Sequence, residues 1–193
     1  MNSVASKRTV DPVDEPWTLA EVAQHLRVTD AAEHSYIASA LGAARQMAED
    51  YTGRALLKQT WKSYWHGFPT IFTLGHPPLI SVTAIRYLDA DGTEQTLATS
   101  VYRTVSNDLD APFIELAYGE SWPSTRGISQ DVHVEYIAGY GESAELIPLP
   151  VRKAILLQVG DLYEHRASIA VGTVTQLHLA AELLLVPYVA QLR

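Results

Sequence analysis

The sequence has no cysteine among its 193 residues, and its basic residues are outnumbered by acidic ones. Without cysteine, the chain can form neither a disulfide framework nor a thiolate metal site. The 14 Lys and Arg against 22 Asp and Glu give a net charge of −8, which argues against a surface that wraps a nucleic acid backbone. An acidic wall that DNA passes without being held is still compatible with this charge.

Long apolar runs are lacking as well. No window holds 18 or more apolar residues, so we expect no membrane-spanning helix. The first residues, MNSVASKRTVDPVDEP, have no apolar core of a signal peptide, and the cytoplasm is the default compartment. Residues 1–16 are polar and interrupted by proline, which predicts a flexible N-terminal arm.

Helical signals lie towards both ends of the chain. Thr18 and Glu21 fit a capping box and predict a short helix to about residue 26. Apolar residues three and four apart predict a second helix over about 31–51, which Gly53 would end.

The C-terminal part of the chain has a helical pattern as well. Pro148 and Pro150 open a predicted helix that extends to about residue 166. A loop over 167–175 and a short helix that begins near 180 and stops before Pro187 would follow.

The middle of the chain has the period of β-strands. Asp91-Gly92 is a strong turn signal inside a predicted hairpin over 77–97. The connections are short, so we expect antiparallel pairing. The other predicted strands lie at about 59–68, 101–106, 113–118 and 132–139.

The order of these elements predicts an α+β fold. A helical bundle formed by the N- and C-terminal helices would carry an inserted antiparallel β-sheet block, because neither helical half can bury its apolar faces alone. The predicted segments are a flexible arm over 1–16, N-terminal helices over 17–56, the β-block over 57–147, and C-terminal helices over 148–193 that pack back on the N-terminal ones.

No catalytic motif is complete. The sequence has only half of a nucleophile elbow, no phosphate-binding glycine loop and no closely spaced histidine pair. We therefore predict no catalytic, cofactor-binding or metal-binding residues and no enzyme activity. The alternative is a carbohydrate-binding or glycosidase-like module, in which carboxylates stand beside aromatic sugar platforms. Its candidates are Glu115, Glu120, Glu135, Trp61, Trp65 and Trp122.

Several segments, taken in order, resemble the tailed-phage head–tail connector family, the gp6-like or phiE125 gp8-like proteins. The resemblance spans roughly residues 15–190 and is weakest over 167–180. The segments that carry it are EPWTLAEVAQHLRV (15–28), AARQMAEDYTGRAL (43–56), QTWKSYWHGFP (59–69), HPPLISVTAIRYLDADGTEQTL (76–97), AYGESWPSTRG (117–127), VHVEYIAGYG (132–141), IPLPVRKAILLQVGDLYEHR (147–166) and ELLLVPY (182–188).

The resemblance implies a structural adaptor subunit that forms a homo-oligomeric ring beneath the portal protein and continues the DNA channel towards the tail. It implies a tail-side completion or stopper protein as a further partner, DNA that passes without sequence-specific binding, no cofactor and no membrane. The protein would reside in the virion at the head–tail junction, and in the bacterial host cytoplasm before assembly.

Two segments are candidate partner contacts. One is the loop at Trp122 and Pro123, for which anchoring on the chain's own sheet is the competing interpretation. The other is the apolar C-terminal stretch, which could equally dock on the chain's own helices. Its residues are Leu183, Leu184, Leu185, Val186, Pro187 and Tyr188.

Overall fold

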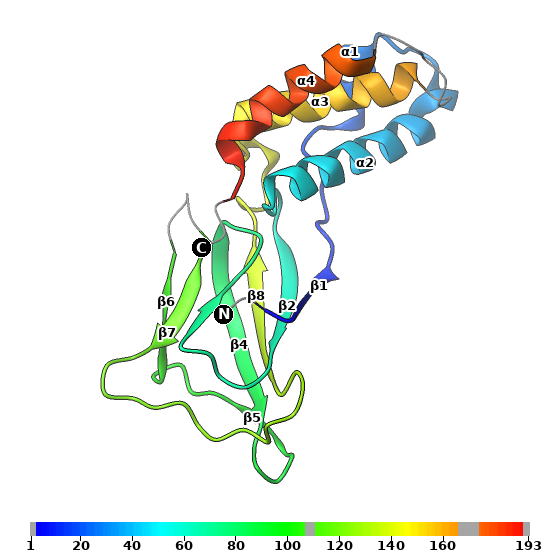
Figure 1. Cartoon of the computed structure of the whole chain (residues 1–193). Coiled ribbons are helices and arrows are strands. Elements are labelled where there is room, and N and C mark those ends of the chain that lie inside the picture. The colour runs from blue at the N-terminus through cyan, green and yellow to red at the C-terminus, as the bar shows by residue number, and fades with distance from the viewer. Residues whose placement is uncertain (1–2, 107–110, 166–173, 191–193) are drawn as a thin grey trace. The chain divides into compact units, whose positions relative to one another are not determined.

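The computed structural model describes residues 3–106, 111–165 and 174–190. The chain divides into two compact units. The β-unit comprises residues 1–12, 58–140 and 190–193, and the helical unit comprises residues 13–57 and 141–189. Within these units the described residues form helices and antiparallel sheets, which confirms the predicted α+β class with an inserted β-block (Figure 1).

The β-unit contains two antiparallel sheets among its described residues. The larger has the strand order β1-β2-β8-β4-β5, and the smaller has the order β3-β7-β6. The large sheet consists of β1 (Ala5–Val10), β2 (Gln59–Trp65), β8 (Val132–Ala138), β4 (Leu79–Leu88) and β5 (Glu94–Thr96). The small sheet consists of β3 (Ile71–Thr73), β7 (Phe113–Leu116) and β6 (Tyr102–Val105).

The core of the β-unit forms where alternate residues of the strands point inward. Trp65, Phe72 and Val134 are at most 1% exposed, and the ring of Trp65 meets Phe72 edge-on with centroids 4.9 Å apart. Tyr136 is buried beside them, and its hydroxyl donates to the carbonyl of Gly75 at 3.3 Å. Burial raises the pKa of Tyr136 to about 12. The small sheet thus shares a core with the large one.

The prediction of a flexible arm over residues 1–16 is wrong for the part that forms β1. Residues 5–10 pair antiparallel with β2, and the hydroxyls of Ser6 and Ser63 lie 2.7 Å apart. Five of the six β1 residues are exposed. The strand is thus held mainly through its backbone, which leaves no apolar alternation in the sequence to reveal it.

The helical unit contains α1 (Leu19–Leu26), α2 (His34–Thr52), α3 (Leu149–Glu164) and α4 (Val174–Leu185). Short 3-10 helices lie at Ala31–Glu33, Ala144–Leu146 and Val186–Tyr188. Helix α3 packs against both α2 and α4, and α1 contacts α2 and α3 (Figure 1). The capping box of Thr18 and Glu21 is present, and Gly53 ends α2 in the left-handed conformation with φ of 66°.

Helix α4 begins earlier than the sequence predicts. It starts at Val174, inside the predicted loop over 167–175, and ends at Leu185, before Pro187 as expected. The part of the predicted loop over 167–173 lies outside the described residues. Val174 and Thr175 are β-branched, so local propensity disfavours the helix that forms there.

A buried ion network joins the start of the helical unit to α2. The Arg45 guanidinium donates from Nε to Glu15 at 2.8 Å and from Nη1 to Glu49 at 2.9 Å. The second oxygen of Glu49 accepts the backbone N–H of Leu56 at 3.0 Å. Burial disfavours the charge of Arg45, but the two carboxylates outweigh it and raise its pKa. The network fixes residue 15 and the segment after α2 to the same helix.

Candidate functional site

The loop between β7 and β8 is anchored on the β-unit by an aromatic cluster. The indole of Trp122 stacks on Phe68, with centroids 5.0 Å apart and planes at 10°, and meets Phe72 edge-on at 5.5 Å. Pro123 beside it is half-buried. Trp122 therefore anchors the loop on the chain's own β-unit. Only part of the Trp122 side chain is left exposed for a partner.

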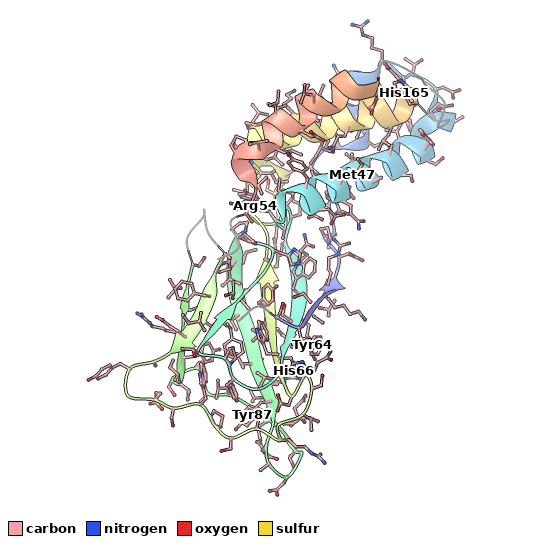
Figure 2. All side chains as sticks on the ribbon, in the orientation of Figure 1. Met47, Arg54, Tyr64, His66, Tyr87 and His165 are labelled. Atoms are coloured by element: carbon pink, nitrogen blue, oxygen red, sulfur yellow. The ribbon has the colours of Figure 1, made fainter. Side chains whose placement is uncertain are left out.

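Asp131 holds the far end of the same loop. Its carboxylate accepts the backbone N–H of Gly67 at 2.6 Å and that of Gly127 at 2.9 Å. Burial would raise the pKa of Asp131, but these bonds and those from Thr125 and Ile128 together hold it below its usual value. His66, just after β2 (Figure 2), accepts the backbone N–H of Gln130 through Nδ1 at 3.0 Å. The loop is thus a fixed structural element at this end.

The carboxylates of the glycosidase alternative have basic partners of their own. Glu135 on β8 pairs with Lys62 at 3.3 Å, and Glu115 on β7 pairs with Arg103. These two strands belong to different sheets, and Glu120 is exposed in the loop. Each carboxylate forms an ion pair with a basic residue on the neighbouring strand, which is the arrangement expected of a solvated sheet face.

The tryptophans of that alternative do not form sugar platforms either. Trp65 is 1% exposed, and Trp122 is covered by Phe68 and Phe72. The ring of Trp61 stacks on His76 with centroids 3.5 Å apart. Their faces are therefore engaged by other side chains of the β-unit, and the structure does not bring them together with the carboxylates into a sugar site.

His133 occupies the polar face of the large sheet. Its Nε2 lies 3.9 Å from both Glu94 and Glu135. Burial is the main cause that lowers the pKa of His133, with help from the positive charge of Lys62, and the two carboxylates act in the opposite direction. Over the described residues, no group of three or more His, Asp or Glu side chains is arranged to hold a metal ion.

The apolar C-terminal stretch divides into a buried and an exposed face. Leu185 is fully buried and Leu184 is half-buried, whereas Leu183 and Val186 are 63% and 54% exposed. Pro187 is also exposed. The buried residues dock on the chain's own helices, and the exposed residues lie on the surface, where the partner contact stays a prediction.

The end of this stretch is tied to the helical unit by its backbone. Arg54, directly after α2 (Figure 2), donates from Nε to the carbonyl oxygen of Tyr188. Leu179 is 54% exposed and precedes Leu183 by one helical turn, and Val189 is 42% exposed beyond it. We call the exposed residues Leu179, Leu183, Val186 and Val189 the C-terminal apolar surface. The sequence pointed to this segment but not to which of its residues face outward.

Three solved structures contain chains that resemble this one over nearly its whole length. The neck of an empty GTA particle, computed with C6 symmetry, contains a chain that is 25% identical with a TM-score of 0.80, over 97% of this chain and 96% of that one. The virion of a native gene transfer agent particle gives 25% identity and a TM-score of 0.77, with coverage of 98% and 97%. The neck of a native GTA particle with C12 symmetry gives 26% and 0.70, with 94% of both chains.

Other comparisons give no match. No protein-family model matches the chain, and no curated protein does. A search of the described residues also finds no helix long and apolar enough to cross a membrane. The class of protein that this fold resembles is therefore defined by the particle structures: chains that occur in the necks and virions of gene transfer agents.

Proposed function

We propose that this chain is a structural subunit of the neck of a phage-like particle and acts as a head–tail connector. The observation that carries the proposal is the TM-score of 0.80 to a chain from a particle neck, with 97% and 96% of the two chains aligned. Both units take part in a match of this extent. The whole architecture is therefore shared, not only a common supersecondary motif.

In this role the subunit assembles as a ring beneath the portal protein, joins it to a tail-side completion or stopper protein, and continues the DNA channel. Two of the similar chains come from necks computed with C6 and C12 symmetry, as expected for cyclic assemblies. The net charge of −8 suits a channel wall along which DNA slides without being held. The protein works without a cofactor, in the virion after assembly and in the host cytoplasm before it.

The engaged carboxylates and tryptophans of the β-unit support a structural role over an enzymatic one. Glu115 and Glu135 form ion pairs with their strand neighbours, and Trp122 is stacked in a loop anchor. Such a protein acts by geometry and contact surfaces. We assign partner contact to the C-terminal apolar surface first, and to the exposed rim of Trp122 and Pro123 second.

The proposal is tested by following the protein into particles. Removing it should leave DNA-filled heads that are not joined to tails, as seen by electron microscopy of negatively stained lysates. Immunogold labelling of complete particles should place the chain at the head–tail junction. Normally joined particles in its absence would contradict the proposal.

The partner surface is tested by the mass of the protein in solution, alone and with the portal protein encoded nearby. The variant Leu183→Ser with Val186→Ser should lose a portal complex or a ring that the unchanged protein forms, because both side chains are exposed apolar groups. Glu182→Ser, an exposed residue of the same helix, is the matched control and should keep it. A chain that stays monomeric and binds no portal would contradict the connector role.

A further inference from the structure

The large sheet of the β-unit has two open strand edges. On one side, β1 pairs only with β2. On the other side, β5 pairs only with the part of β4 from Arg86 to Leu88, and Leu97 adds one bond to the carbonyl of Ile85. In the described part of the chain, no strand pairs with the outer edge of β4 from Leu79 to Ala84. Open edges are templates for the addition of another strand.

The two open edges lie at the same height of the sheet. Each residue of β1 can be followed across β2 and β8 to a residue of β4 through the strand register. Three such rows are Ser6–Ser63–Val134–Ile85, Lys7–Lys62–Glu135–Ala84 and Arg8–Trp61–Tyr136–Val82. A copy of β1 placed beside the open edge of β4 would thus meet it along the length of both strands.

The directions of the two edges also match. Neighbouring strands in this sheet are antiparallel. The row that contains Lys7 passes through four strands, in the order β1, β2, β8 and β4. Because four is even, β1 and β4 run in opposite directions. A second copy related by rotation about an axis along the strands therefore presents β1 antiparallel to β4, the more stable pairing. The inward-facing row of Ser6 and Ile85 then continues into the inward-facing row of the neighbour.

We propose that β1 of one copy pairs with the outer edge of β4 in the next copy, so that the large sheets of successive copies join edge to edge around the ring. This inference rests on the proposed connector function and names the surface through which copies meet. Contact between two different edges is heterologous, and heterologous contacts close into rings when the rotation allows it.

The side chains at both edges fit a partner of this kind. Val10 on β1 is 55% exposed and Ile80 on β4 is 46% exposed, and the row that contains Val10 ends at Ser81, next to Ile80. Pairing would place Val10 opposite Ser81, so that both apolar residues lie at the same end of the joined sheet. The charge of Lys7 and the two bulges of β4 are features by which edge strands avoid indiscriminate pairing. The edges thus favour a matched partner over any exposed strand.

The experiment uses the absence of cysteine in the native sequence, since every disulfide must then come from introduced residues. Directly opposed residues of antiparallel strands have Cα atoms about 4.5–5.5 Å apart, within the range that a disulfide spans. Particles are prepared with the variant that carries Lys7→Cys and Ala84→Cys together, oxidised mildly and analysed on non-reducing gels. We expect a ladder of covalent multimers that contains most copies of the protein.

The control pairs Lys7→Cys with Asp91→Cys, because Asp91 lies in the exposed turn between β4 and β5 and should stay uncross-linked. Lys7→Cys alone should give no dimer. A dimer there would mean that β1 pairs with β1 and would overturn the inference. A chain present in purified necks whose Lys7→Cys and Ala84→Cys cysteines stay reduced would overturn the edge pairing alone. Absence of the unchanged chain from purified necks would overturn the proposed function.

Discussion

The indole of Trp122 lies flat against the ring of Phe68, with centroids 5.0 Å apart and planes at 10°, although 54 positions separate the two residues in the chain. Phe72 closes the cluster by meeting Trp122 edge-on. The loop from β7 to β8 is therefore held near its middle, between the end of β7 at Leu116 and the start of β8 at Val132. The contact explains why so long a connection keeps a defined path.

Replacing Trp122 by alanine should destabilise the β-unit. The change removes a large half-buried ring from an aromatic cluster, and we expect a loss of about 2–3 kcal/mol in the free energy of unfolding. Chemical denaturation followed by circular dichroism measures it. Tyr118→Ala is the control, because Tyr118 is fully exposed in the same loop. Unchanged stability of the Trp122 variant, with loss of assembly, would instead make Trp122 a partner contact.

Asp131 should make the stability of the β-unit sensitive to acid. Its pKa is lowered in the folded state, so its ionised form contributes stability above the ordinary pKa near 4, and this contribution is lost as the pH falls through the folded value. Asp131→Asn should cost about 2 kcal/mol at neutral pH, because backbone N–H groups lose a charged acceptor. Urea denaturation from pH 7 to pH 3 tests this. A variant as acid-sensitive as the unchanged protein would contradict the assignment.

The ion network of the helical unit should respond differently to single and double changes. Arg45→Ala removes a charge partner of the Glu49 carboxylate, which is only 7% exposed, and should cost about 3 kcal/mol. Replacing both residues, Arg45→Met with Glu49→Gln, removes both charges and keeps an amide oxygen as acceptor for the N–H of Leu56, so it should cost less than the single change. Denaturation of Arg45→Met, of Glu49→Gln and of the variant with both changes gives the coupling energy. Additive losses would show that Arg45 acts through packing alone.

The sequence predicted elements whose signals are local. Thr18 and Glu21 form the capping box that their spacing indicates, Gly53 ends α2, and Asp91-Gly92 turns between β4 and β5. These signals succeed because the residues that make each bond lie within about four positions of each other.

The elements that were missed depend on distant partners. Residues 5–10 become β1 because β2 offers a backbone to pair with, and Ile71–Thr73 becomes β3 by pairing with β7. The face of the C-terminal stretch that points outward is set by where α3 packs, not by the run of leucines itself. Neither the stacking of Trp122 on Phe68 nor the matching heights of β1 and β4 can be predicted from the hydrophobic periodicity of a short sequence window.

The anchored loop also offers a practical site for a reporter. Tyr118 projects fully into solvent, while Trp122 and Asp131 fix the residues that follow. Exposed loop positions accept inserted sequence with little effect on folding. A short peptide epitope or a fluorophore introduced at Tyr118 would therefore be displayed on the surface of the β-unit.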